Sequence, residues 1–137
     1  FGVTPKVALL AASNFGTRRS ESVNRMRDAL ALLLAADPNL EIDGEMRADT
    51  ALVPAIRERI FKDSYLEGQA NVLIMPSVDA ANIAMNLLTV LGEGVAVGPI
   101  TLGLERPAHI LTPSATVRRV INMSTLAVVD AQLELGS

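Results

Sequence analysis

The 137-residue sequence contains no cysteine and no tryptophan, and its only histidine is His109. The absence of cysteine excludes disulfides and thiolate metal sites, and one histidine cannot build a multi-histidine metal site. Aromatic residues make up only 3% of the chain, so a platform for stacking nucleobases is not expected. The formal net charge is −3, so the chain lacks the excess of positive charge that a general nucleic-acid or anionic-membrane binder needs.

Long apolar runs are also missing. No run reaches the roughly 18 residues that a membrane helix needs, and segment 95–104, which comes nearest, contains glycine and proline. We find no signal peptide and expect a cytoplasmic location. Half of the residues are hydrophobic, which excludes a disordered tail. The chain begins at Phe1, and we expect a piece of a longer protein, with no reason to divide 1–137 into two domains.

Strands are predicted where short apolar runs or period-two patterns occur. The apolar runs 7–11 and 70–75 predict buried strands. Residues 40–47 alternate between apolar and charged side chains, which predicts a strand with one buried and one solvated face. Gly44 is expected to mark a β-bulge in this strand. The charged residues expected on the solvated face are Glu41, Asp43, Glu45 and Arg47.

Two later segments, 95–100 and 108–111, also look extended. The connection between them is too short for a parallel crossover, which takes about a dozen residues. We therefore expect antiparallel neighbours, or segments in different parts of the fold.

Apolar residues at spacings of three and four predict helices after the first two strands. Ser20 or Ser22 can cap the first helix, which should stop at 37–39 because the residue before a proline avoids helical geometry. Asp49 and Thr50 should cap a second, short helix that runs to about Phe61 with Pro54 in its first turn, where proline is tolerated.

Two further helices are predicted in the second half of the chain. Asp79 is expected to cap the third helix and Ser114 the fourth, which is long and apolar on more than one face. The alternation of strands and helices predicts an α/β fold with a largely parallel sheet. The buried stripe of the third helix is expected to comprise Ile83, Leu87, Val90 and Leu91.

Three segments that follow predicted strands are candidate ligand sites, because ligands of open α/β sheets bind at the carboxyl ends of strands. Segment 13–19 offers a glycine, hydroxyls, free amides and two guanidiniums for an anion, or it is a capped turn with solvated arginines. In segment 112–119, Arg118 and Arg119 lie in the first turn of a predicted helix, where positive charge opposes the helix dipole. Either a bound anion relieves this conflict or the two arginines point outward. Segment 76–82 could position a substrate amide or hydroxyl, or only cap a helix.

The single histidine and the acidic residues are given structural roles. His109 lies in an apolar segment without an acid or nucleophile nearby, and no catalytic triad is favoured. No metal site is expected, because the calcium-loop spacing is absent. The predicted ligand-binding residues, for phosphate or another anionic ligand, are Ser13, Asn14, Gly16, Thr17, Arg18, Ser77, Asn82, Gly98, Pro99, Thr112, Ser114, Arg118 and Arg119.

A series of short motifs in one order, each weak alone, resembles the carboxyl-terminal half of the phosphate acetyl/butyryltransferase family. The resemblance extends from about Pro5 to Gln132 and implies a three-layer sandwich around a mostly parallel sheet. The motifs that carry it are 7–16, 42–45, 49–54, 70–76, 81–84, 98–100 and 103–104.

One stretch departs from the active members of that family. Their motif after the last strand reads Ser-Arg-Gly-Cys-Ser and is followed by an acid, whereas the matching positions here are Thr112, Pro113 and Arg119. Proline cannot replace a guanidinium that binds phosphate, and a cation stands where the family has an acid. The resemblance therefore implies a domain without transferase activity, with an active phosphate acetyltransferase and a purely structural dimerisation module as alternatives.

Residues 110–119 and 121–123 resemble one branch of this family, the terminal domains of large bacterial NADP-dependent malic enzymes. This resemblance implies a regulatory domain that senses acetyl-CoA or a related acyl-CoA and supports assembly into a homodimer or higher oligomer. An upstream module would oxidise and decarboxylate malate to pyruvate with NADP and Mg or Mn. No cofactor is expected in this segment itself.

Overall fold

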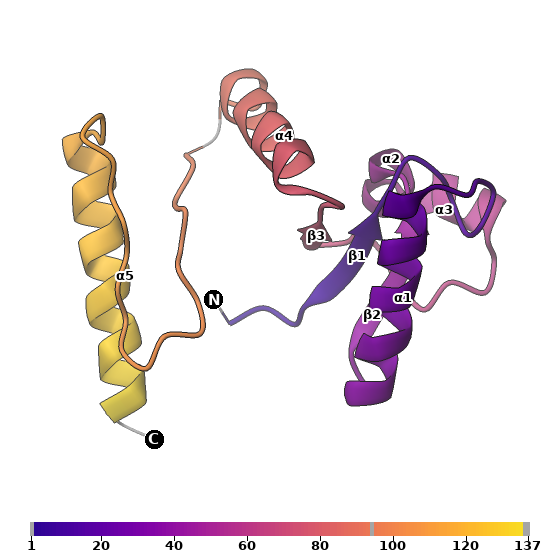
Figure 1. Cartoon of the computed structure of the whole chain (residues 1–137), viewed down its shortest axis with the longest axis horizontal. Coiled ribbons are helices and arrows are strands. Elements are labelled where there is room, and N and C mark those ends of the chain that lie inside the picture. The colour runs from indigo at the N-terminus through magenta and orange to yellow at the C-terminus, as the bar shows by residue number, and fades with distance from the viewer. Residues whose placement is uncertain (1, 94, 136–137) are drawn as a thin grey trace. The chain divides into compact units, whose positions relative to one another are not determined.

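The structure is a computed structural model that describes residues 2–93 and 95–135, with only the backbone described at the last two. The chain divides into two compact units, Phe1–Leu87 and Leu88–Ser137. The prediction of one undivided domain fragment over 1–137 stays a prediction. In chain order the elements are β1 (Lys6–Leu10), α1 (Glu21–Ala36), β2 (Glu41–Met46), α2 (Ala48–Leu52), α3 (Pro54–Ile60), β3 (Val72–Ile74), α4 (Val78–Leu91) and α5 (Val117–Leu135) (Figure 1).

The first unit contains a sheet of three strands in the order β2-β1-β3. Both pairs are parallel, and Val7 of the central strand lies opposite Ile42 on one side and Val72 on the other. The α/β class and the parallel sheet are confirmed. The third strand is shorter than the predicted run 70–75, since only Val72–Ile74 pairs with β1.

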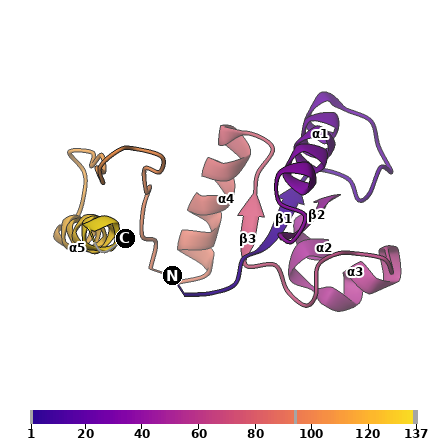
Figure 2. The ribbon, with the colours of Figure 1, turned by 90° about the horizontal axis from the view of Figure 1, so that it is seen from below.

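Helices cover both faces of this sheet, as Figure 2 shows with α1 on one side and α2 and α3 on the other. Successive residues of β1 point to opposite faces, so this five-residue strand supplies both halves of the core. On the α1 side, Val7 and Leu9 pack with Met26 and Ile42. The cluster on the other face consists of Ala8, Leu10, Met46, Ala51, Leu66 and Ala70.

The first and last residues of α1 agree with the boundaries predicted from the sequence. The Ser20 hydroxyl accepts a hydrogen bond from the Val23 N–H at 3.3 Å, which satisfies one of the free amides of the first turn. The helix ends at Ala36, because Asp37 is extended and precedes Pro38.

A β-bulge at Gly44 reorganises the second half of β2. Leu9 pairs with Gly44 but Leu10 pairs with Met46, so Glu45 is the extra residue. A Cβ atom at Gly44 would lie 2.7 Å from the carbonyl oxygen of Leu9, so only glycine fits there. The predicted bulge is confirmed, and it places Ile42 and Met46 on opposite faces of the sheet, where strict alternation would place them together.

The prediction of a solvated acidic face on β2 is wrong. Asp43 and Glu45 are both buried, because each supplies acceptors to loops that pack over the strand. The Asp43 carboxylate accepts hydrogen bonds from the Ser64 hydroxyl at 2.6 Å and from the Tyr65 N–H at 2.9 Å. A buried carboxylate surrounded by donors is tolerated, whereas an unpaired one would be very costly.

The predicted helix from Asp49 to about Phe61 is two helices. Val53 between them is extended (φ −120°, ψ 98°), as expected for a residue that precedes a proline. Pro54 opens the second helix, where its missing N–H costs nothing. The cap position of the first is Arg47, with Asp49 in the first turn.

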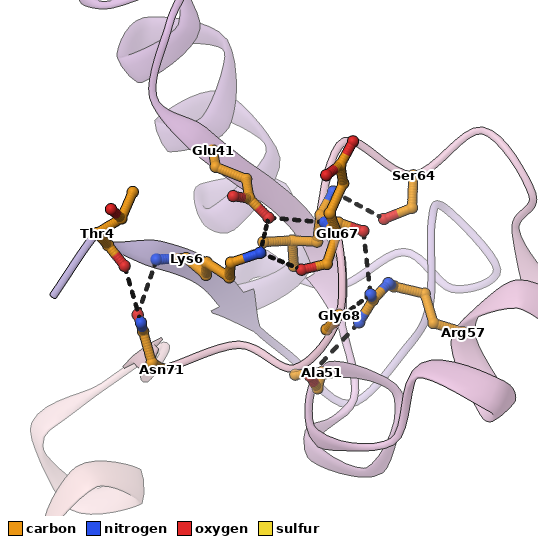
Figure 3. A network of polar contacts seen from close by, with 10 residues as sticks. Thr4, Lys6, Glu41, Ala51, Arg57, Ser64, Glu67, Gly68 and Asn71 are labelled. Atoms are coloured by element: carbon orange, nitrogen blue, oxygen red, sulfur yellow. Dashed lines mark hydrogen bonds and ion pairs between the residues drawn. The ribbon is translucent and has the colours of Figure 1, made fainter.

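The buried side chain of Arg57 in α3 links several backbone segments around α2 and α3 (Figure 3). Its side chain is only 2% exposed. Its guanidinium donates to the carbonyl oxygens of Thr50 at 3.3 Å and Leu66 at 3.0 Å, and also to those of Ala51 and Gly68. One cation therefore joins the end of α2 to the loop that leads into β3.

A second polar cluster lies at the start of β1 and β2 (Figure 3). The Glu41 carboxylate lies 3.1 Å from the Lys6 ammonium and accepts the Glu67 N–H at 2.7 Å. Partial burial raises the pKa of Glu41, but the Glu67 hydrogen bond and Lys6 more than offset this, so the pKa is lower than usual.

Two predictions about α4 are wrong. The Ser77 hydroxyl, and not Asp79, accepts the N–H of the first turn, from Ala80 at 3.2 Å. No residue of α4 is buried, and the predicted buried stripe is open to solvent, with Ile83 62% and Val90 76% exposed. An apolar stripe on a helix normally packs against a core, and within the described residues nothing covers the stripe of α4.

In the second unit the described residues form α5 and irregular segments. The segments 95–100 and 108–111, predicted to be extended, form no strand within the described residues. The cap of α5 is Thr116, whose hydroxyl accepts the Arg119 N–H at 3.2 Å, and not Ser114 as predicted. Met123 is the one buried residue among the described side chains of this helix.

Replacing Arg57 tests the carbonyl cluster. Arg57→Ala should lower the free energy of unfolding by about 3–5 kcal/mol, because it leaves buried carbonyl oxygens without a donor. Arg59→Ala, on the exposed side of the same helix, should change it by no more than about 0.5 kcal/mol. Urea unfolding of the purified protein measures both. Equal effects of the two substitutions would contradict the role of Arg57.

The lowered pKa of Glu41 predicts a pH dependence of stability. The carboxylate stabilises the folded state above the pKa of the unfolded chain, and this contribution is lost as the pH falls through the folded-state pKa. The difference in unfolding free energy between the wild type and Glu41→Gln should be at most about 1 kcal/mol at neutral pH. It should shrink toward zero below about pH 4. A difference that grows on acidification would refute the assignment.

Candidate functional site

The order of the strands places the topological switch point of the sheet at the carboxyl ends of β1 and β3. The chain runs from β1 through α1 to β2 at one edge, and then through α2 and α3 to β3 at the other. Ligands of open α/β sheets bind where connections diverge in this way. Segment 11–20 follows β1, and segment 75–77 follows β3. An Arg25 guanidinium nitrogen donates to the Pro76 carbonyl oxygen at 3.1 Å, so α1 is tied to the second of these connections.

Glu45 anchors the loop that follows β1. One of its carboxylate oxygens accepts hydrogen bonds from the Ser13 hydroxyl and the Gly16 N–H, both at 2.8 Å. Its carbonyl oxygen accepts the Phe15 N–H, also at 2.8 Å. Phe15 has a positive φ of 46°, and its ring stacks on Phe61 at 4.3 Å between centroids. The loop is therefore held by the Glu45 carboxylate, by the Glu45 carbonyl oxygen and by the stacking on Phe61.

The expectation of free amides in this loop is wrong. The N–H groups of Phe15 and Gly16 bind Glu45, and the N–H of Thr17 donates to the Asn14 carbonyl oxygen at 3.1 Å. The Asn14 N–H donates to the Thr17 hydroxyl at 3.3 Å. Ser13 and Asn14 are themselves buried. Their predicted contact with a ligand stays a prediction, but the donors on which it depended have internal partners.

The guanidiniums of this region remain accessible. Arg18 and Arg19 are exposed, and within the described ranges no ion pair involves either. Arg27 is half-exposed, and its Nε lies 3.9 Å from a Glu45 carboxylate oxygen. Three arginines therefore lie on or beside the loop after β1, and the first two can meet a ligand anion without breaking an ion pair.

The connection after β3 behaves as a helix cap. Ser77 provides the acceptor for the first turn of α4, while Asn82 is exposed in the second turn. Segment 76–82 thus contains a helix cap, although at Ser77 and not at Asp79, and any ligand contact of Ser77 or Asn82 stays a prediction.

In the second unit, Arg119 binds the protein itself. Its Nε donates to the Gly98 carbonyl oxygen at 2.9 Å, and a terminal guanidinium nitrogen donates to the same oxygen. Gly98 is buried, so Arg119 clamps the 98–99 segment onto the first turn of α5. Arg118 is exposed, as the outward alternative predicts.

The remaining predicted residues of this unit lie in the loop before α5. The hydroxyls of Thr112 and Ser114 are 3.1 Å apart, and Pro113 between them is exposed. Pro99 is exposed as well. A pair of hydroxyls that satisfy each other can still bind a ligand oxygen, and segment 112–119 itself contains no aspartate or glutamate.

His109 has the structural role that was predicted for it. Its Nδ1 accepts the Thr101 N–H at 3.4 Å, which links the two extended segments. Its Nε2 is buried and has no hydrogen-bond partner within the described chain.

Sequence reasoning missed Glu45 and Arg57, the two charged residues that organise the first unit. Glu45 was assigned to a solvated strand face because it alternates with apolar residues, and Arg57 was given no role. Gly44 was the available signal, because a bulge changes the face to which the following residue points.

Neither a metal-binding cluster nor a membrane-spanning helix is found among the described residues. Among them, no group of three or more His, Asp or Glu side chains could hold a metal ion. None of the helices in that part of the chain combines the length and the apolar character needed to cross a membrane.

Comparisons with known proteins agree with this fold. The family described as Phosphate acetyl/butaryl transferase matches residues 1–128. A phosphotransacetylase from Staphylococcus aureus superposes with a TM-score of 0.84 and 36% identity, over 95% of this chain and 41% of that protein. The chain therefore belongs to the phosphate acetyl/butyryl transferase family, and the predicted class of protein is confirmed.

More similar relatives belong to one branch of that family. An NADP-dependent malic enzyme of Escherichia coli is 53% identical over 98% of this chain, and an NAD-dependent malic enzyme of Rhizobium meliloti is 50% identical over 96%. The chain spans 18% and 17% of these proteins. It is therefore similar to the transferase-like region of malic enzymes, as predicted. Because the two relatives differ in the named coenzyme, similarity over this chain does not select between NADP and NAD.

The adjacent arginines of α5 offer a matched test of the clamp on Gly98. Arg119→Met should raise hydrogen exchange in residues 97–101 by at least about tenfold, because a charged hydrogen bond worth roughly 1.5–3 kcal/mol is lost. Arg118→Met, one residue earlier and exposed, should leave it unchanged. Exchange measured by mass spectrometry on the purified protein decides, and equal protection in both variants would refute the clamp.

Proposed function

We propose that this chain is the regulatory and oligomerisation region of a malic enzyme, that it senses acetyl-CoA or a related acyl-CoA, and that it has no transferase activity of its own. The similarity to malic enzymes at 50% to 53% identity supports this parentage. In the parent protein, an upstream module would oxidise and decarboxylate malate with NADP and Mg or Mn.

The observation that carries the non-catalytic part is the state of Arg119. At the positions where active transferases are expected to have a serine, an arginine and an acid, this chain has Thr112, Pro113 and Arg119. Arg119 donates twice to the Gly98 carbonyl oxygen and so has a structural partner. A general base needs a group that accepts a proton, and a guanidinium cannot.

Acyl-CoA binding is supported by the accessible cations. Coenzyme A carries a diphosphate and a ribose phosphate, and arginine binds such groups through charge-assisted hydrogen bonds. Arg18 and Arg19 in the first unit and Arg118 in the second are exposed. A regulator needs only a different affinity for the ligand in two states of the protein, and no nucleophile.

Oligomerisation is supported by apolar surface on the helices. Large apolar side chains are exposed along α4, including Leu88 at 62% and Leu91 at 77%, and along α5, including Ile121 at 59%. Contiguous exposed apolar patches usually mark interaction surfaces. A second subunit, or another part of the same protein, would remove this surface from water.

Titration of the full-length protein with acetyl-CoA tests the proposal. The rate of malate decarboxylation should respond to acetyl-CoA, and the half-saturating concentration should rise about five- to tenfold in Arg118→Ala and in the double variant Arg18→Ala/Arg19→Ala. Arg59→Ala, an exposed arginine of α3, is the matched control and should behave like the wild type.

Four results would overturn parts of this proposal. Unchanged titrations in the arginine variants would remove these residues from the site. Formation of acetyl-CoA from acetyl phosphate and CoA by the purified protein would establish an active transferase. A monomer in sedimentation velocity would exclude the role in assembly, whereas an oligomer without any acetyl-CoA effect would favour a purely structural module.

A further inference from the structure

Glu45 is a buried carboxylate for which the proposed function has no role. Its side chain is 1% exposed, and it follows the bulge at Gly44 on the edge strand β2. Arg27 is the one cation recorded beside it within the described residues, at the long distance of 3.9 Å. Burying a carboxylate is costly unless hydrogen bonds satisfy it, so its partners define its role.

Those partners all belong to the loop after β1. The Ser13 hydroxyl and the Gly16 N–H converge on one carboxylate oxygen, and the Phe15 N–H binds the carbonyl oxygen of the same residue. Phe15 and Gly16 both have positive φ, 46° and 84°. The turn that they form directs the Gly16 N–H toward the Glu45 carboxylate and the Phe15 N–H toward the Glu45 carbonyl oxygen. Backbone N–H groups of turns can bind anions, and here the Gly16 N–H binds the protein's own carboxylate.

This internal anion changes how the loop can take part in binding. A loop whose N–H groups are already satisfied cannot offer them to a ligand phosphate. It is, however, held in one conformation before the ligand arrives, and that lowers the entropy lost on binding. Arg18 and Arg19 follow directly on the anchored residues and are exposed. The anchored loop therefore fixes the backbone position from which their side chains extend.

We propose that Glu45 is a positioning residue for the acyl-CoA site: its carboxylate binds the Ser13 hydroxyl and the Gly16 N–H and so orders the loop 13–17, from which Arg18 and Arg19 contact the ligand phosphate. This inference rests on the proposed function. Beside these hydrogen bonds, the half-exposed Arg27 of α1 lies 3.9 Å from the other carboxylate oxygen and partly offsets the buried charge.

The experiment compares substitutions at Glu45 in the full-length protein. Glu45→Ala removes the acceptors, and Glu45→Gln keeps a carbonyl oxygen that can accept from Ser13 and Gly16 but removes the charge. Glu41→Gln is the matched control, since Glu41 is another carboxylate of β2 that accepts a backbone N–H outside this loop. Hydrogen exchange of the peptide 11–19 and acetyl-CoA affinity are measured at a temperature where circular dichroism shows every variant folded.

In Glu45→Ala, exchange of the peptide 11–19 should rise while that of α1 stays unchanged, and the Kd for acetyl-CoA should rise at least about tenfold. Glu45→Gln should restore most of the loop protection and part of the affinity, and Glu41→Gln should match the wild type. If Glu45→Ala fails to fold, the comparison of Glu45→Gln with Glu41→Gln decides, with a smaller rise expected in both measurements.

Two outcomes overturn the inference: loop exchange that is unchanged in the Glu45 variants, or loop exchange that rises while the Kd stays constant. A wild-type protein that does not bind acetyl-CoA would instead refute the proposed function and, with it, the ligand part of this inference. Exchange of the peptide 11–19 would still decide whether Glu45 orders the loop.

Discussion

The close approach of β2 to β1 at Gly44 is the constraint on which the first unit depends. Any side chain at Gly44 would overlap Leu9, and the bulge at this point makes Glu45 the extra residue of the strand. From that position the Glu45 carboxylate reaches the loop after β1, while Met46 joins the core cluster opposite α1. Gly44 thus determines the path of β2, the position of the buried Glu45 carboxylate and, through it, the conformation of the loop after β1.

The charged groups discussed above are of two kinds. Glu45, Arg57 and Arg119 are bound to the protein's own backbone, and each holds a loop in place. Arg18, Arg19 and Arg118 are exposed. Internal partners make the first kind poor ligand contacts, because a ligand would have to compete with hydrogen bonds that are already made. Within the first unit, the proposed ligand contacts are therefore Arg18 and Arg19, which follow the loop that Glu45 anchors.

The two units differ in how completely they satisfy their own apolar surface. In the first unit, β1 is buried between α1 on one face and α2 with the 66–70 loop on the other. The second unit buries little of α5, and α4, which spans the boundary between the units, has no buried residue. The chain spans 41% of a phosphotransacetylase and 18% of a malic enzyme. Uncovered helices in such a segment fit a region that is completed by further protein.

The sequence by itself determined the elements whose signals are local. The apolar run of β1, the Ser20 cap of α1, the bulge glycine and the α/β order follow from periodicity and turn chemistry, which act over a few residues. Only the tertiary structure decided the roles of Glu45, Arg57 and Arg119, because each binds backbone groups that are distant in the sequence or in a neighbouring loop. The burial of α4 was misjudged for a related reason: an apolar stripe indicates that a helix needs a cover, whereas the cover itself depends on what packs against it.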